Sequence, residues 1–208
     1  MSGTWSTKPE RGIVQRTIQA LGENGIGASV VATREEAARQ ALSLIPPGSE
    51  VFTGTSVTLE ELGLEHELNE SGRYLTVKGR LAAMDPHTQQ REMRKVGAGP
   101  DYSVGSVQAV TETGSVMIAS LTGSQIPSYA YGAGRVIWIV GVQKIVKDID
   151  EGFRRIREYL VERETERARK AYGLPESFES FPSKILLFGR EVRPGRVTLL
   201  FVDEVIGH

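Results

Sequence analysis

The fold is decided by residues 50–63, EVFTGTSVTLEELG, where a short apolar run enters a loop of glycine and hydroxyl residues and then a helix. Thr58 and Glu61 have the spacing at which a capping hydroxyl and a carboxylate satisfy each other's free N–H groups. Small hydroxyl residues let backbone N–H groups approach an anion, and the following helix adds the positive end of its dipole. We therefore predict an anion-binding loop after a buried strand. The predicted ligand contacts are Thr53, Gly54, Thr55, Ser56 and Thr58.

The flanking segments repeat this alternation of strand and helix. Residues 13–21 have the apolar spacing of an amphipathic helix, residues 28–32 form a short strand pattern, and Thr33 begins a second helix with Glu36 in the capping position. Residues 135–141, RVIWIVG, give the strongest strand signal, and such an apolar run is typical of a strand buried on both faces of a parallel sheet. We expect an open, Rossmann-like α/β fold with a mostly parallel sheet flanked by helices.

The last third of the chain predicts a long helix over about residues 148–170 and a C-terminal β-hairpin. The hairpin would join residues 185–188 to residues 197–202 through the turn RPGR at 193–196. Along the helix arginines alternate with glutamates, which predicts a solvated face with intrahelical ion pairs. These arginines are Arg154, Arg155, Arg157, Arg163, Arg167 and Arg169.

The length of 208 residues predicts a single domain. Within it we expect a helix, strand and helix over residues 1–50, a core with both candidate loops over 51–172, and the hairpin over 173–208.

The composition excludes several functions. The 25 basic and 26 acidic residues leave no broad attraction to nucleic acid or to a membrane surface. The absence of cysteine excludes disulfides, thiolate catalysis and cysteine-bound zinc or iron–sulfur clusters within this chain. The three histidines are too scattered for a metal site, and no nicotinamide or flavin fingerprint is present, so no metal and no cofactor is predicted.

No part of the sequence predicts export or membrane insertion. Residues 1–11 lack the apolar core of a signal peptide. No run approaches the roughly 18 apolar residues that a membrane-spanning helix needs. We therefore expect a cytoplasmic protein.

A second candidate site is Glu112, which lies between two expected strands and is flanked by Thr111, Thr113 and Gly114. A partly desolvated carboxylate in this setting can serve as general acid, general base or nucleophile. We predict Glu112 as the catalytic residue, with Thr113 and Gly114 as ligand contacts in one pocket with the Gly54 loop. Two plainer alternatives stay open. Glu112 would then be a solvated turn residue, and Gly54 a turn glycine beside hydroxyls that cap the helix.

Four segments together resemble the LUD domain of bacterial lactate-utilization proteins. They are residues 54–64, GTSVTLEELGL, residues 109–115, AVTETGS, residues 140–146, VGVQKIV, and residues 194–204, PGRVTLLFVDE. Their order and spacing match over nearly the whole chain. The resemblance implies a fold like that of the superfamily of ribose-5-phosphate isomerase, glucosamine-6-phosphate deaminase and CoA transferase. It also implies a role in the oxidation of L-lactate to pyruvate beside iron–sulfur partner subunits.

Two motifs carry over from the resemblance. Residues 53–58 resemble the phosphate-binding loop of the sugar-phosphate isomerases, and Glu112 stands in the Glu-Thr-Gly motif typical of the family. Many relatives have a cysteine-rich segment before the last hairpin, whereas residues 179–190 contain no cysteine. This departure puts in doubt any role of this chain itself in carrying a metal or redox centre.

Three functions follow as hypotheses, and the sequence leaves open whether the chain is an enzyme. The first is an accessory protein or subunit of lactate utilization that binds a small carboxylate or phosphate ligand at the Gly54 loop. The second is a self-contained isomerase or acyl- or CoA-transferase-like enzyme that uses Glu112. The third is a non-catalytic binding or scaffold domain. The sequence does not decide between a monomer and a homodimer.

Overall fold

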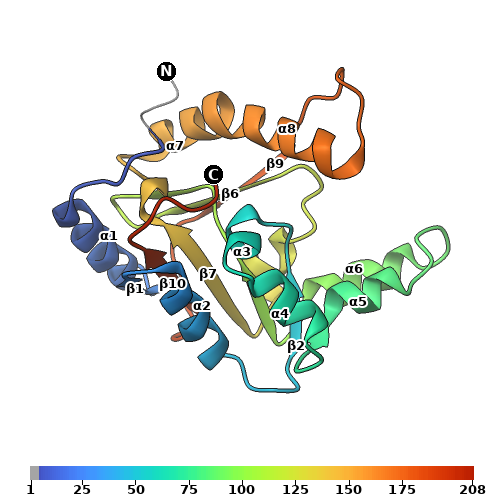
Figure 1. Cartoon of the computed structure of the whole chain (residues 1–208). Helices are drawn as coiled ribbons and strands as arrows, with labels where there is room; N and C mark the ends of the chain where they lie inside the picture. Colours follow the sequence, from blue (N-terminus) through green and yellow to red (C-terminus); the bar gives the residue numbers. More distant parts are fainter. Residues whose placement is uncertain (1–4) are drawn as a thin grey trace.

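The computed structural model describes residues 5–208, and the strands in this range form two sheets. The larger sheet is entirely parallel (Figure 1). Its spatial order is β1 (Gly27–Val31), β10 (Val197–Val202), β7 (Arg135–Gly141), β4 (Tyr102–Gly105), β2 (Glu50–Thr53) and β3 (Leu75–Thr76). The smaller sheet is mixed, with the order β8 (Ile145–Val146), β5 (Ala109–Thr111), β6 (Val116–Ser120) and β9 (Lys184–Phe188). The predicted α/β fold with a mostly parallel sheet is confirmed.

Helices cover both faces of the larger sheet and the outer face of the smaller one. α2, α3 and α4 pack on one face of the larger sheet, while α1 and the smaller sheet cover the other. α7, a π-helical segment and α8 run as one long helix over the outer face of the smaller sheet (Figure 1). The α-helices are α1 (Arg11–Glu23), α2 (Arg34–Ser43), α3 (Val57–Glu61), α4 (Leu64–Glu70), α5 (Val77–Ala82), α6 (Gln90–Ala98), α7 (Ile149–Arg155) and α8 (Val161–Tyr172). The segments Ser128–Gly132 and Ile156–Leu160 are π-helical, and Val142–Lys144 form a 3-10 turn.

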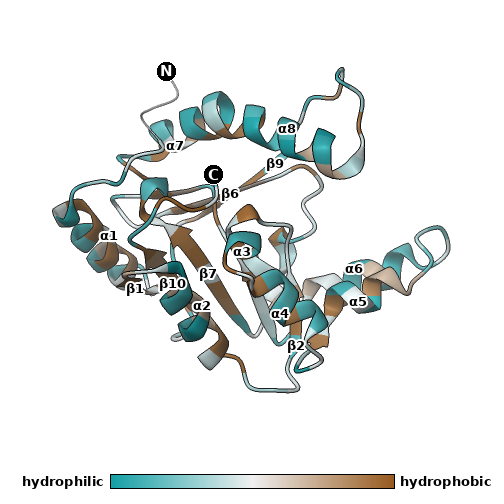
Figure 2. Cartoon of the chain, viewed as in Figure 1, coloured by the Kyte–Doolittle hydropathy of each residue, from teal (hydrophilic) through white to brown (hydrophobic). Residues whose placement is uncertain are grey.

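β7 shows why the apolar pattern produces this architecture. Successive side chains of a strand point to opposite faces of the sheet. Val136, Trp138 and Val140 belong to the core on the α1 side, whereas Ile137 and Ile139 belong to the core on the α2 side. β7 is therefore buried on both faces, as predicted, and lies between β10 and β4. Figure 2 shows this apolar strand inside the molecule and hydrophilic residues along the helices that cover it.

The predicted C-terminal hairpin is wrong. β9 pairs antiparallel with β6 in the smaller sheet, whereas β10 lies between β1 and β7 in the larger sheet and is parallel to both. The turn at residues 193–196 therefore lies on a connection between two sheets. The physical reason is the apolar character of β10, whose Leu199 and Phe201 are buried on one face and Leu200 and Val202 on the other. A strand of this kind gains most by burial within a parallel sheet with both faces covered.

The predicted N-cap of α2 is confirmed, whereas the predicted N-cap of α3 is wrong. The Thr33 hydroxyl accepts a hydrogen bond from the Glu36 N–H, as its position predicts. At α3 the N-cap is Ser56, whose hydroxyl accepts from the Leu59 N–H at 3.4 Å, and not Thr58. The Thr58 side chain is thereby free to point elsewhere.

None of the helices in residues 5–208 has the length and apolar character to cross a membrane.

Candidate functional site

A cavity of about 480 Å³ lies at the carboxyl ends of three neighbouring strands of the larger sheet. The Gly54 loop follows β2, Ser106 follows β4, and Lys144 follows β7 through a short 3-10 turn. Loops at the carboxyl ends of parallel strands meet at one edge of an open sheet, which is where ligands bind in such folds. Side chains of the π-helical segment and of α8 close the cavity from the opposite side. The predicted position of the Gly54 loop is thus correct.

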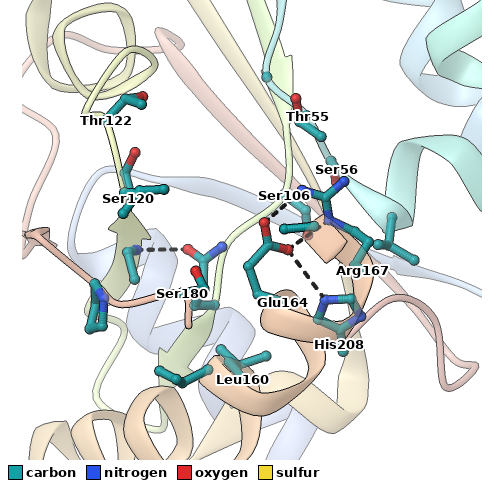
Figure 3. Close-up of a pocket in the computed structure, with 18 of the residues that line it drawn as sticks. Thr55, Ser56, Ser106, Ser120, Thr122, Leu160, Glu164, Arg167, Ser180 and His208 are labelled. Carbon is teal, nitrogen blue, oxygen red and sulfur yellow. Dashed lines mark hydrogen bonds and ion pairs between the residues drawn. The ribbon is translucent and has the colours of Figure 1, made fainter. Parts of the chain in front are cut away.

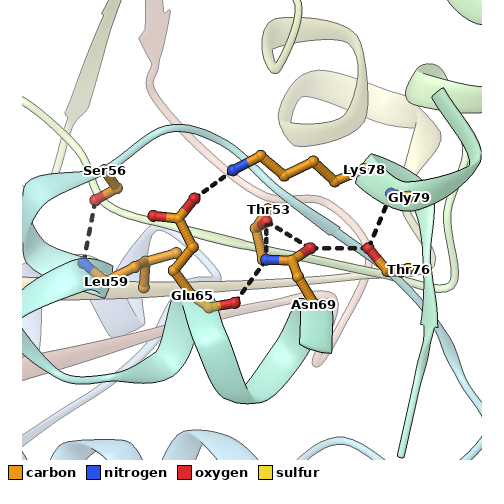
Figure 4. A network of polar contacts seen from close by, with 8 residues as sticks. All are labelled: Thr53, Ser56, Leu59, Glu65, Asn69, Thr76, Lys78 and Gly79. Atoms are coloured by element: carbon orange, nitrogen blue, oxygen red, sulfur yellow. Dashed lines mark hydrogen bonds and ion pairs between the residues drawn. The ribbon is translucent and has the colours of Figure 1, made fainter. Parts of the chain in front are cut away.

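Four of the five residues predicted in the loop line this cavity, namely Gly54, Thr55, Ser56 and Thr58. Thr53 does not line it, because its hydroxyl is buried in a network with the Asn69 amide at 2.9 and 3.2 Å. Thr76 donates to the same amide oxygen at 2.8 Å, so the network joins the end of β2 to α4 and β3 (Figure 4). Thr53 therefore holds the start of the Gly54 loop in place through this network, and its side chain does not line the cavity.

Lys144 is a candidate site residue that the sequence motifs did not reveal. Its side chain is almost completely buried, at 2 % exposure, yet it lines the cavity. The Nζ atom donates to the Thr58 and Ser106 hydroxyls, both at 3.1 Å. Burial, together with the positive charge of Arg155, lowers the pKa of Lys144 to about 7, although Glu61 acts in the opposite direction. The sequence contains a signal for this site, since a lysine within the apolar run 136–146 must either be buried or mark a turn.

Arg155 lies behind Lys144 and corrects the expectation of a fully solvated helix face. Its side chain is fully buried, and its Nη1 donates to the Gln108 carbonyl oxygen. Its Nε and Nη2 atoms are buried without a hydrogen-bond partner among the described residues. Burial lowers the pKa of Arg155 to about 10, so it stays charged at neutral pH. Its guanidinium also lies 5.2 Å from the Tyr159 ring centre, a cation–π contact that partly replaces lost hydration.

An ion cluster at one side of the cavity is formed by Glu164, Arg167 and His208 (Figure 3). Arg167 donates to both carboxylate oxygens of Glu164, at 2.6 and 2.7 Å, and the His208 ring lies 3.9 Å away. Burial by itself raises the pKa of Glu164, but Arg167 and His208 outweigh it and lower the pKa to about 2. The pair of Arg167 with Glu164 is an intrahelical ion pair, as predicted, but it lines the cavity and is not on a fully solvated face.

Tyr129 presents its hydroxyl close to the Gly54 loop. A Cβ atom at Gly54 would lie 3.8 Å from this oxygen, and one at Gly105 only 1.8 Å from it. Glycine at the end of β4 thus leaves the space that the phenol occupies. Burial raises the pKa of Tyr129, so the hydroxyl keeps its proton at neutral pH.

The structure places Glu112, Thr113 and Gly114 outside this cavity. They form the turn between β5 and β6, and the Glu112 carboxylate lies 3.7 Å from Arg16 on α1 at 31 % exposure. The Asn24 side-chain amide donates to the carbonyl oxygens of Thr113 and Gly114 at 3.0 and 3.2 Å. The turn is therefore docked on the end of α1, and the single pocket predicted for Glu112 and the Gly54 loop is not what the structure shows.

Residues 5–208 contain no cluster of three or more histidine, cysteine, aspartate or glutamate side chains that could hold a metal ion. The cavity instead offers hydroxyls, one lysine and an arginine paired with a glutamate. This set can bind an anion, transfer protons and, through the lysine, act as a nucleophile.

A parallel sheet covered on both faces, with a cavity at the carboxyl ends of its strands, defines an open α/β protein. The chain belongs to the LUD domain family, whose model matches residues 14–198. A crystal structure of a DUF162 family protein from Deinococcus radiodurans has a similar fold, with a TM-score of 0.52 at 13 % identity over 92 % of this chain and 96 % of that one. The structure of eIF2B delta from Chaetomium thermophilum gives a TM-score of 0.35 at 14 % identity over 68 % and 54 %. The comparison with curated proteins gave no match.

Proposed function

We propose that the chain binds a small carboxylate ligand in this cavity and serves as a subunit or accessory protein in the oxidation of L-lactate to pyruvate. Membership of the LUD domain family supports the role. The proposed partners are iron–sulfur subunits, which would carry the electrons that a chain without cysteine cannot hold in a cysteine-bound cluster.

One observation carries the proposal for the ligand. Lys144 and Arg155 place two basic groups in or behind the cavity wall, and within residues 5–208 neither forms an ion pair with a carboxylate. A buried charge without a counter-ion costs several kcal/mol. A bound carboxylate would offset that cost, whereas a neutral or cationic ligand would not. The excess of positive charge therefore favours an anion.

The binding test compares anionic ligands with a neutral analogue. L-Lactate and pyruvate are each titrated against the full chain in a thermal unfolding assay, with lactamide as the neutral control. A ligand present at 100 times its Kd stabilises the folded state by about 2.7 kcal/mol, which corresponds to a rise in Tm of about 5–10 °C for a chain of this size. We expect the carboxylates to raise Tm and lactamide to leave it unchanged. Equal effects of lactamide and lactate, or no effect of any of them, would contradict the proposal.

The proposed role is tested by adding the purified chain to iron–sulfur partner subunits and measuring L-lactate oxidation. A rate no higher than that of the subunits alone would speak against an accessory role.

A further inference from the structure

The hydrogen bonds around the Lys144 amine suit an unprotonated amine, which can act as a nucleophile as well as contribute charge. An unprotonated amine has two N–H groups and one lone pair. The structure provides one hydroxyl for each N–H, the Thr58 Oγ1 and the Ser106 Oγ, both at 3.1 Å from Nζ. With both N–H groups engaged, the lone pair is the part of the amine left for a ligand. Since all three residues line the cavity, that ligand can reach it.

The amine is also unprotonated to a useful extent at neutral pH. A solvated lysine with a pKa near 10.4 is unprotonated in only about 1 of 2,500 molecules at pH 7. Burial and Arg155 lower the pKa of Lys144 to about 7, so a far larger share of the molecules carries the free amine at neutral pH. The other charged groups near Lys144 are Glu61 on α3 and, lining the same cavity, the ion cluster Glu164, Arg167 and His208.

A ligand with a carbonyl next to a carboxylate fits both features of the cavity. Arg155 lies behind the cavity wall and forms no ion pair within residues 5–208, so its positive charge favours the carboxylate, and the Lys144 amine can attack the carbonyl carbon. We propose that Lys144 is a covalent nucleophile that forms an imine with the carbonyl carbon of a small 2-oxo acid bound in the cavity. The inference rests on the proposed function, because it assigns a ligand class and a chemical step to the same cavity.

The step balances without an oxidant or reductant. The lone pair of the amine forms a C–N bond to the carbonyl carbon, and the carbonyl oxygen takes up the proton that the nitrogen loses, which gives a carbinolamine. The C–O bond then breaks, and the hydroxyl leaves as water with the second amine proton. The hydroxyls of Ser106 and Thr58, which are within hydrogen-bond distance of Nζ, are placed to relay these protons.

The test is reductive trapping on the full chain. The protein is incubated with pyruvate and cyanoborohydride, which reduces imines faster than ketones, and then analysed by intact-mass and peptide mass spectrometry. We expect one adduct per chain, heavier by pyruvic acid less one oxygen atom, on the peptide that contains Lys144. L-Lactate has the same carbon skeleton without the ketone, so it should give no adduct.

Two variants separate this site from ordinary surface labelling. Lys144→Met should abolish the adduct, whereas Lys147→Met, which removes an exposed lysine three residues away, should keep it. The labelling rate should level off above about pH 8, whereas that of surface lysines keeps rising toward pH 10. If Lys144→Met does not fold, peptide mapping of the wild-type chain still locates the adduct.

The outcomes also separate this inference from the proposed function. If pyruvate raises Tm but no adduct forms on Lys144, or labelling is spread over surface lysines, the imine is excluded while carboxylate binding stands. If neither pyruvate nor L-lactate raises Tm and no adduct forms, both fail.

Discussion

Residues 54–58 and residues 111–114 are both short runs of glycine and hydroxyl residues next to a strand, yet the structure uses them differently. In the first run Gly54 has room for a Cβ atom, and the Thr58 hydroxyl faces Lys144 at the cavity. In the second run the hydroxyls of Thr111 and Thr113 bond to each other at 2.9 Å, and Gly114 lies against α1. The first run keeps polar groups available for a ligand, whereas the second uses them to build a turn.

The elements that pack against such a run decide whether it can take a ligand. Both sequences offer small residues and hydroxyls, which suit an anion and a tight turn equally well. The difference is what packs against them. At the Glu112 turn, α1 occupies the space, and Asn24, which follows α1, donates to the carbonyl oxygens of Thr113 and Gly114. At the Gly54 loop a cavity lies there instead.

The largest expected effect concerns the buried amine at the cavity. The folded-state pKa of Lys144, about 7, lies below the unfolded value near 10.4, so between these pH values the unfolded chain binds more protons. Its contribution to stability is thus fully present above about pH 10 and is lost as the pH falls toward 7, a change of about 4 kcal/mol. We expect urea unfolding of Lys144→Met to lack this rise in the free energy of unfolding between pH 7 and 10, while Lys147→Met keeps it. Parallel pH profiles for Lys144→Met and the wild type would show that Lys144 is not desolvated.

The second-largest effect is expected for Gly114→Ala, with Gly54→Ala as the matched substitution in the other run. A Cβ atom at Gly114 would lie 2.7 Å from the Ala20 carbonyl carbon and oxygen, and its φ of +80° disfavours any L side chain. Gly114→Ala should therefore lower the free energy of unfolding by about 3 kcal/mol. At Gly54 the added Cβ would meet only ordinary contacts of 3.7 and 3.8 Å, so Gly54→Ala should change it by less than about 1 kcal/mol. Urea titrations of both variants measure the difference. Equal losses would remove the contrast between the turn and the loop.

The smallest effect is expected at Glu112. Its contact with Arg16 is 3.7 Å long and exposed to solvent, and such pairs contribute about 0–1 kcal/mol. Glu112→Gln should therefore leave both the stability and the ligand-induced rise in Tm close to those of the wild type. A clear loss of pyruvate or lactate binding in this variant would restore the prediction that Glu112 belongs to the functional site.

Much of the fold could be predicted because it depends on local pattern. The apolar run of β7, together with the alternation of strand and helix signals before it, indicates a parallel sheet flanked by helices. From the sequence alone, a C-terminal hairpin could not be distinguished from two strands that belong to different sheets. A turn sequence indicates that the chain bends, but it does not indicate with which strand each flanking strand pairs. Only the burial of β10 on both faces distinguishes the two cases.

One part of the candidate site, the Gly54 loop, could be predicted because it depends on local sequence, whereas the buried basic residues could not. The Gly54 loop follows directly from residues 53–58, and its place at the carboxyl end of β2 follows from the fold class. Arg155 had the sequence pattern of a solvated helix residue, and only the packing of α7 on the smaller sheet buries it.

By itself the sequence determined the elements, the parallel sheet and the loop where a ligand is expected, since these depend on hydrophobic periodicity and on the conformations of glycine and hydroxyl residues. Only the tertiary structure decided that Lys144, 86 residues from Thr58 and 38 from Ser106, is the group that meets this loop, while Glu112 does not. The physical reason is that the pKa of an amine and the room for a ligand depend on desolvation and on neighbouring charges, which come from residues far apart in the chain.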